Sequence, residues 1–336
     1  MAAPMTLPWL FYSRRGKPIS CIVYRLLSTN SSTQKENKTH GEAKKTHFGF
    51  QSVAEDEKEE RVYKVFKNVA SKYDLMNDSM SFGIHRLWKD HFINRMAPVA
   101  GTKLLDVAGG TGDIAFRFLK YIQSQNEKPV VTDENFTIPT SINAGAFSIP
   151  SDFAEEDEHI VDLSDYKEDT SHVTVCDINQ EMLNVGKARA EEAGITSGIS
   201  WVQGNAESLP FEDNTFDAYS IAYGIRNCTH IDKVLTEAYR VLKPGGRFMC
   251  LEFSQVNNLI LRRLYDSYSF EVIPVMGQVL AKDWKSYQYL VESIRQFPNQ
   301  RRFAAMLQHA GFGIVSYENL TFGVSAVHSG YKLMKS

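Results

Sequence analysis

Three glycines lie close together in the segment Leu104–Asp113, which reads LLDVAGGTGD and joins an apolar run to the start of a helix. Glycine leaves no side chain between backbone N–H groups and a ligand, and Thr111 and Asp113 add polar groups at the helix N-terminus. The pattern predicts a nucleotide-type binding loop at the end of a strand. A tight strand-to-helix turn without a ligand is the alternative that this segment alone leaves open.

The order of the glycines separates this turn from a dinucleotide-binding one. The dinucleotide fingerprint is G-x-G-x-x-G, whereas the turn here is A-G-G-T-G-D, without a third glycine three residues on. A pyrophosphate clamp is therefore disfavoured, and with it a nicotinamide oxidoreductase. An acidic residue at the end of the strand suits a zwitterionic ligand such as S-adenosylmethionine, whose ammonium group a carboxylate can approach. Asp106 and Asp113 are both candidates for that contact.

Two later segments carry side chains that an adenosyl ligand needs. The run VTVC ends in Asp177, whose carboxylate can accept hydrogen bonds from both ribose hydroxyls. The acidic residue that binds ribose usually follows the glycine turn by ~20 residues, whereas Asp177 follows it by about 70. Leaving out the 46 residues of segment 126–171 brings this spacing close to the usual value. Asn205, beside Ala206, can bond the edge of adenine. An Asp at a strand end also often caps the next helix, and this alternative stays open for Asp177.

Strand-like and helix-like runs alternate after residue 102. Strands are expected at 103–108, 173–178, 199–203, 216–222 and 247–253, and helices at 113–125 and 179–193. This alternation predicts a parallel sheet covered on both faces, with ligands outside the carboxyl ends of the strands. Two last runs, 313–320 and 324–331, predict an antiparallel hairpin at the sheet edge. The expected fold class is therefore α/β, with a seven-stranded, mostly parallel sheet.

Helical patterns also lie outside this alternation. Apolar spacing predicts helices near 62–73 and 86–96, with a break at 73–85, and these helices would cover the carboxyl edge of the sheet. Residues 258–296 are expected to be helical and are rich in aromatic side chains. Core packing and the lining of an apolar ligand pocket are both open for this segment.

Segment 126–171 interrupts the alternation. It holds twelve acidic residues against two lysines and shows little periodicity. It is expected to be a disordered or loosely ordered acidic insertion. An acidic docking surface for a basic partner is the alternative.

The first 35 residues differ in composition from the rest. They hold five basic residues, recurrent Ser and Thr, and no acidic residue before Glu36. This composition is typical of a mitochondrial presequence, with a disordered basic tail as the alternative. Residues 36–60 are polar and charged, and are expected to form a linker.

The composition limits which other classes of protein this chain could belong to. The net charge is −3, so no basic field indicates nucleic acid as a partner. No stretch approaches the ~18 apolar residues of a membrane span, although peripheral contact with a membrane stays open. The four cysteines have no C-x-x-C spacing, so neither a disulfide framework nor a zinc site is expected.

Several motifs taken together resemble one family. They are the glycine turn at 106–113, KYD at 72–74, GIRN at 224–227, LEFS at 251–254 and DWKSYQYL at 283–290. In combination they resemble the UbiE/Coq5 family of class I S-adenosylmethionine-dependent quinone C-methyltransferases, over roughly residues 47–333. The resemblance implies a Rossmann-like methyltransferase domain at 61–333, with the insertions 126–171 and 258–296 within it.

The resemblance and the presequence imply a reaction of ubiquinone (coenzyme Q) biosynthesis. A methyl group would pass from S-adenosylmethionine to a ring carbon of 2-methoxy-6-polyprenyl-1,4-benzoquinol, giving the 5-methoxy-2-methyl-3-polyprenyl quinol. No metal is expected, because a sulfonium methyl is already an activated electrophile. The expected cofactor-binding residues are Asp106, Gly109, Gly110, Thr111, Gly112, Asp177, Asn205 and Ala206. Ala222 departs from the serine of bacterial relatives, so a side-chain hydroxyl contact is absent there.

Arg226 is the first expected catalytic residue. It would stabilise the developing phenolate, or a water that takes the quinol proton. Its guanidinium is too basic to act as an ordinary base itself. The other candidates, which would line the helical cover, are Asn227, Tyr73, Asp74, Asn77, His85 and Tyr287. For His85 a surface or capping role is equally open.

The resemblance also implies partners and a location. They are the polyprenyl benzoquinol substrate, a multi-subunit ubiquinone biosynthetic complex, and peripheral contact with the matrix side of the mitochondrial inner membrane; a homodimer is left open. The alternatives are a methyltransferase for another small molecule, such as a demethylmenaquinone-type acceptor, and a non-catalytic scaffold subunit. The presequence disfavours a bacterial menaquinone role, and intact cofactor residues disfavour the scaffold.

Overall fold

The computed structural model describes residues 44–69, 73–126 and 171–334, and it describes no side chain between residues 68 and 76. The expected presequence at 1–35 lies outside these residues, as does the acidic insertion apart from its two end residues. Both therefore stay predictions.

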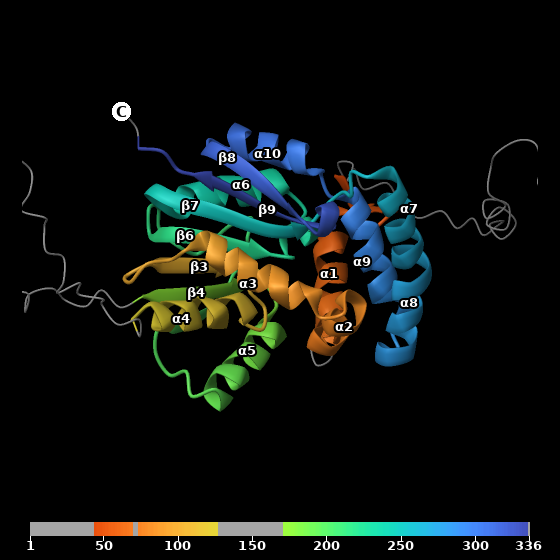
Figure 1. The fold of residues 1–336 in the computed structure, drawn as a ribbon, viewed down its shortest axis with the longest axis horizontal. Coiled ribbons are helices and arrows are strands. Elements are labelled where there is room, and N and C mark those ends of the chain that lie inside the picture. Colours follow the sequence, from red (N-terminus) through yellow and green to blue (C-terminus); the bar gives the residue numbers. More distant parts are fainter. Residues whose placement is uncertain (1–43, 70–72, 127–170, 335–336) are drawn as a thin grey trace, which may run out of the picture. The chain divides into compact units, whose positions relative to one another are not determined.

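A seven-stranded sheet forms the centre of the described chain (Figure 1). Its order is β5-β4-β3-β6-β7-β9-β8, and all neighbours are parallel except the pairs that β9 makes with β7 and β8. The strands are β3 (Lys103–Val107), β4 (His172–Asp177), β5 (Ile199–Gln203), β6 (Phe216–Ala222), β7 (Leu242–Phe253), β8 (Gly313–Leu320) and β9 (Ser325–Tyr331). The expected fold class and edge hairpin are confirmed. Because the chain order reverses between β3 and β6, their carboxyl ends border the crevice where such sheets bind ligands.

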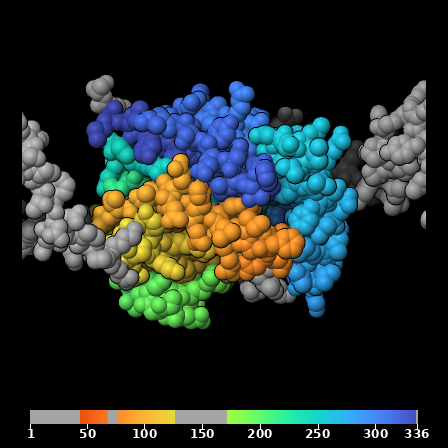
Figure 2. All heavy atoms as spheres, in the orientation of Figure 1, coloured from red at the N-terminus to blue at the C-terminus, as the bar shows by residue number. Residues whose placement is uncertain are grey.

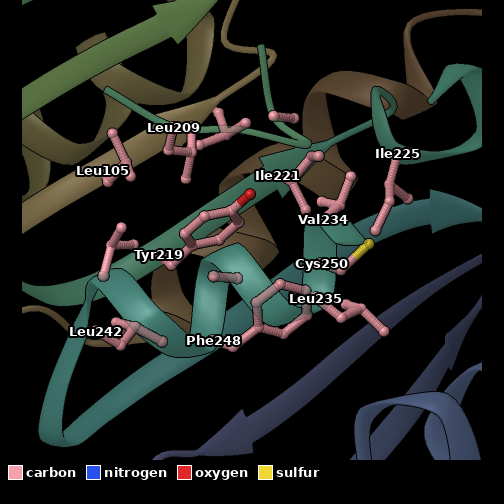
Figure 3. Packing of buried hydrophobic residues seen from close by; sticks show 14 of the residues in the cluster. Leu105, Leu209, Tyr219, Ile221, Ile225, Val234, Leu235, Leu242, Phe248 and Cys250 are labelled. Carbon is pink, nitrogen blue, oxygen red and sulfur yellow. The ribbon is translucent and has the colours of Figure 1, made fainter. Parts of the chain in front are cut away.

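Both faces of the sheet are buried, as its alternating side chains require. The neighbours Leu104 and Leu105 point to opposite faces and join separate apolar clusters. One cluster includes residues of α3 (Ile84–Met96) and α4 (Asp113–Asn126); the other includes residues of α6 (Ile231–Val241) and α10 (Gln300–His309). Figure 3 shows the second, where Tyr219 stacks on Phe248 with ring centroids 5.3 Å apart. These helices hold the strand ends, and the loops that follow them, in fixed positions.

The linker expected at 36–60 is wrong from Lys45 onward, because the chain forms regular secondary structure there. From Lys45 the chain forms a hairpin of β1 (Lys45–Phe48) and β2 (Gln51–Ala54), and α1 (Glu55–Val69) follows directly. Gly49, at φ +57°, makes the tight turn. The aromatic ring of Phe48 stacks on Tyr289, with centroids 4.1 Å apart. A tertiary contact thus stabilises a segment whose polar sequence resembles a linker.

The break expected at 73–85 is also wrong for most of its length. Residues Tyr73–Ser81 form α2, and only Phe82 and Gly83, at φ +50° and +75°, separate it from α3. Helices α1 and α2 lie beyond one end of the sheet (Figure 1). The second helix expected in the cover, α3, instead packs along one face of the sheet.

A second group of helices completes that end (Figure 1). It consists of α7 (Leu259–Ser267), the π-helix η7 (Tyr268–Val272), α8 (Ile273–Met276), the π-helix η8 (Gly277–Ala281) and α9 (Trp284–Gln296). The helical character expected for 258–296 is thus present. Within the described ranges, no helix has the length and apolar character needed to cross a membrane.

Candidate active site

A first cavity lies at the carboxyl ends of the central strands. It is lined by residues that follow β3, β4, β5 and β6 and by the inner face of α1. Seven of the eight expected cofactor residues line it: Asp106, Gly109, Gly110, Thr111, Asp177, Asn205 and Ala206. Gly112 does not, because its backbone faces the Trp201 ring, 2.6 Å from where a Cβ would stand. Gly112 therefore serves packing, in contrast to the expectation.

Asp177 is fixed at the end of β4 by two backbone hydrogen bonds. Its Oδ2 accepts the N–H of Gly110 at 2.9 Å and its Oδ1 that of Asn179 at 2.8 Å. Burial raises the pKa of Asp177 to about 6, although both hydrogen bonds act in the opposite direction. The N-cap of α5 (Gln180–Glu192) is Asn179, whose side chain accepts the N–H groups of Glu181 and Met182. Capping alone thus does not account for Asp177, and its oxygens keep lone pairs for further donors.

Asp106 is buried, and one of its two carboxyl oxygens has no hydrogen-bond donor among the described residues. Its Oδ1 accepts the Ser220 hydroxyl at 2.7 Å, whereas no group of the described residues donates to its buried Oδ2. Burial raises the pKa of Asp106 to about 7. A Cβ at Gly109 would stand 2.7 Å from Oδ2, so only glycine lets the turn pass this carboxylate. The pocket wall therefore fits a ligand that carries a cationic group.

Asp113, the other acidic candidate, already has cationic partners. Lys89 donates to its Oδ2 at 2.6 Å, and Arg117 lies 3.3 Å from its Oδ1. Burial would raise the pKa of Asp113, but these cations outweigh burial and the pKa is lowered. The geometry therefore favours Asp106 over Asp113 as the partner of a ligand ammonium group.

Asn205 and Ala206 form the wall beyond β5. The Asn205 Oδ1 accepts the Glu207 N–H at 2.9 Å, which fixes the amide group in the wall of the cavity. A fixed amide beside a small residue suits the flat edge of a base.

Helix α1 covers this cavity, as expected for the helix predicted near residues 62–73. Val62, Tyr63 and Phe66 line it from above. The helix is held by Lys58, only 2% exposed, whose Nζ donates to the Cys228 carbonyl at 2.9 Å. His230 adds a second link, since its ring nitrogens lie 3.1 Å from Glu55 and 2.7 Å from Glu207. The apolar spacing that includes Val62 and Phe66 predicted this helix, whereas the contacts of Lys58 and His230 were not predicted.

A second cavity, of about 230 Å³, adjoins the first. Phe66, Lys89 and Tyr223 line both. The second cavity is walled mainly by apolar and aromatic side chains, among them Tyr265 and Tyr268 of the 258–296 segment. Of the expected residues it includes Arg226, Asn77, His85 and Tyr287. Asn227 instead lines the first cavity, and its Oδ1 accepts the Tyr289 hydroxyl at 3.0 Å.

Two non-glycine residues at this edge have left-handed backbone conformations. They are Ala108, after β3, with φ +51°, and Tyr223, after β6, with φ +56°. Such conformations are unfavourable for residues with a Cβ and persist where surrounding structure holds them. The backbone at both strand ends is therefore held in place by tertiary contacts at the point where the cavities meet.

Comparison with known proteins assigns the chain to a family. The model of the ubiE/COQ5 methyltransferase family matches residues 54–332. The chain belongs to this family. The bovine protein called 2-methoxy-6-polyprenyl-1,4-benzoquinol methylase, mitochondrial, is 57% identical over 87% of this chain and 85% of its own length. The human and mouse proteins of the same name are 56% identical, over 87% and 91% of this chain and 85% and 89% of theirs. The chain is thus an S-adenosylmethionine-dependent methyltransferase with the class I fold.

Arg226 of this methyltransferase is not a free cation. Its Nη1 lies 3.0 Å from Glu252 Oε1, and the guanidinium also donates to the Tyr223 carbonyl. Both charged side chains are buried, and burial raises the pKa of Glu252 even though Arg226 lowers it. The Arg226 Nε has no partner among the described residues. Glu252, at the end of β7, was missed, although the LEFS motif contains it.

His85 lies in the wall of the methyltransferase's second cavity. It is 6% exposed, and its Nδ1 is 2.8 Å from the Ser81 hydroxyl. The surface and capping alternatives are therefore wrong, since the N-cap position of α3 is Gly83. Burial, with Lys89 nearby, lowers the pKa of His85 to about 4. A pKa this low makes the imidazole a weaker proton acceptor than an ordinary histidine.

The remaining expected residues are placed as follows. Tyr73 and Asp74 begin α2, but their side chains lie outside the described part of the chain. Ala222 lines the first cavity with its methyl group, so any contact with the methyl donor there uses the backbone.

Proposed function

We propose that this chain methylates a ring carbon of 2-methoxy-6-polyprenyl-1,4-benzoquinol in ubiquinone biosynthesis. The supporting observation is a cavity at the strand ends, lined by Asp106 and Asp177, that shares Phe66, Lys89 and Tyr223 with an aromatic cavity. The first suits the methyl donor and the second a quinol ring with an apolar substituent. The names of the bovine, human and mouse relatives agree with this substrate.

The methyl donor would occupy the first cavity. When bound, S-adenosylmethionine supplies a methyl group activated by its sulfonium centre. Asp177 would accept hydrogen bonds from the ribose hydroxyls, and Asn205 with Ala206 would bind adenine. The buried carboxylate of Asp106, beside the glycine turn, would balance the ammonium group of the amino-acid end.

The acceptor would bind in the second cavity, next to the Arg226–Glu252 pair. Loss of the quinol proton puts negative charge on its oxygen, and the Nε of Arg226 is a donor without another partner in the described chain. Because the negative charge of Glu252 offsets the positive charge of Arg226, Arg226 would act by hydrogen bonding and orientation more than by net charge. Holding the ring carbon against the donor can lower the barrier by ~7–11 kcal/mol. The quinol proton would pass to a water, and the ring carbon would lose its hydrogen as a proton after the methyl group is transferred.

Location and assembly belong to the same proposal. The composition of residues 1–35 and the word mitochondrial in the relatives' names support import into mitochondria. A polyprenyl acceptor is lipid-soluble, which supports peripheral contact with the inner membrane on its matrix side. Membership of a multi-subunit biosynthetic complex and homodimer formation are parts of the proposal that rest on family resemblance.

A methylation assay tests the proposal. The full chain is incubated with S-adenosylmethionine, a short-tail 2-methoxy-6-prenyl-1,4-benzoquinol and a reductant, and the product is identified by mass spectrometry. We expect one methyl group on a ring carbon. Methylation of a demethylmenaquinol analogue in place of the benzoquinol would contradict the proposed substrate.

A further inference from the structure

The segment 259–285 presents apolar side chains to the outside of the molecule. Helix α7 has no buried residue, and exposed apolar side chains recur along the whole segment. We call six of them the outer apolar surface: Ile260, Leu264, Val272, Val275, Val279 and Trp284. Single exposed apolar residues are common in proteins, whereas a run over consecutive turns of one helical segment marks an interaction site.

The charges beside this surface are mainly positive. Four exposed basic side chains belong to the segment: Arg262, Arg263, Lys282 and Lys285. Of its three carboxylates, Asp266 pairs with Arg295 and Asp283 caps α9, which leaves Glu271 as the exposed one. Exposed cations around an apolar surface complement an anionic partner.

The second cavity lies close to this segment. Tyr268, within the segment, lines that cavity and donates to the Met80 carbonyl at 2.8 Å. Phe82 also lines the cavity although 80% of it is exposed, and its ring lies 6.4 Å from that of Tyr268. In Figure 2 the cyan and blue segment adjoins the orange surface of α2 and α3. The cavity wall thus reaches the outside beside the outer apolar surface.

We infer that the outer apolar surface docks on an anionic lipid bilayer. Apolar side chains, a tryptophan and flanking lysines and arginines are the combination by which a helix lies in a membrane interface. This docking would let a polyprenyl acceptor enter the second cavity without crossing water. That purpose rests on the proposed function, whereas the docking itself is inferred from the exposed side chains alone. The inference goes beyond membrane contact as such, because it assigns the contact to one segment.

Co-sedimentation of the full chain with vesicles tests the inference. One vesicle is phosphatidylcholine alone, and the other is phosphatidylcholine mixed with phosphatidylglycerol. We expect binding to the anionic vesicles and a partition coefficient about ten-fold lower for Val279→Glu, because a charged residue replaces buried apolar area. Val99→Glu is the matched control, since Val99 is 70% exposed and Val279 71%, and Val99 precedes β3 at the other end of the sheet.

A second variant keeps the test independent of folding. Arg263→Gln with Lys285→Gln leaves the apolar residues intact and should weaken binding about five-fold for each cation removed. Calorimetry with S-adenosylmethionine checks that each variant is folded.

Unchanged vesicle binding in both variants would overturn the inference. So would a dimeric wild type that Val279→Glu makes monomeric without altering vesicle binding, because the surface would then join two copies. Vesicle binding is read without turnover, so a failed methylation assay would leave this result intact.

Discussion

At the scale of single residues, two buried carboxylates lie in the wall of the first cavity. Asp106 and Asp177 both have raised pKa values, and burial is the main cause of each. They differ in their neighbours, because backbone N–H groups satisfy Asp177 whereas Asp106 keeps an oxygen without a donor from the described chain. A site built this way is less stable without its ligand than with it.

Asp177→Ala should weaken S-adenosylmethionine binding by about ten- to a hundred-fold. Hydrogen bonds to a charged group contribute about 1.5–3 kcal/mol, and the ribose hydroxyls would lose theirs. Isothermal calorimetry measures the affinity. Asp213→Ala is the control, because Asp213 pairs with Arg240 at the surface. An unchanged affinity would remove Asp177 from the ribose contact.

Asp106 predicts a pH dependence of stability. Its pKa is about 7 when folded against a reference value of 3.8, so the folded state holds the proton more tightly. The free energy of unfolding should fall as pH rises from about 4 through about 7, by at most about 4 kcal/mol. Asp106→Asn should remove this fall and be more stable than the wild type above pH 7. Urea unfolding across this range is the measurement, and parallel curves for the two proteins would contradict it.

Arg226→Met should reduce turnover while S-adenosylmethionine still binds. Loss of one donor to a developing oxyanion lowers the rate by ~10²–10³-fold. The single variant also leaves Glu252 buried without its cation, which destabilises the fold. Adding Glu252→Gln should restore much of the stability without restoring turnover. If the double variant regains activity, Arg226 serves structure alone.

At the scale of elements, helix α1 is the cover of the donor cavity, and its position depends on Lys58 and His230. The hairpin of β1 and β2 contacts this helix through Arg61, which lies over the Phe48 ring and donates to the Gln51 Oε1 at 3.0 Å. Phe48 also stacks on Tyr289 of α9. Because α1 residues line the first cavity, movement of this helix would change access to it.

Lys58→Met should loosen α1 and speed release of S-adenosylmethionine about ten-fold. The variant loses a charged hydrogen bond to the Cys228 carbonyl but keeps the length of the side chain. Stopped-flow release rates and amide hydrogen exchange of α1 report the effect. Lys64→Met is the matched control on the same helix, since Lys64 is exposed and pairs with Glu60. Equal release rates for both variants would show that Lys58 does not hold the cover.

At the scale of the whole molecule, the acidic segment 127–170 stays a predicted loosely ordered insertion, because it lies outside the described residues. That segment joins α4 to β4, whose partner β3 carries the glycine turn. Its replacement by a flexible Gly/Ser linker should therefore leave S-adenosylmethionine binding and turnover of the short-tail quinol near wild type. Calorimetry and the methylation assay measure both. Loss of donor binding would show that the segment supports the site.

Much of the fold could be predicted because its signals are local. The β3 turn, the strands that end at Asp177 and Ala222, and the last hairpin follow from apolar runs, glycines and strand-end carboxylates. The hairpin at 45–54 could not, because its stability comes from packing on α9. Gly112 was assigned to the ligand for a similar reason, since Trp201 beside it comes from a distant strand.

The sequence by itself determined the class of fold, the family and the group of strand ends that face the donor. Only the tertiary structure decided which side chains pair within the site. It joins Arg226 to Glu252, separates Asp106 from the cations that hold Asp113, and brings Lys58 under the loop after β6. The physical reason is that spacing along the chain fixes secondary structure, whereas charge pairing and burial depend on residues that meet only after folding.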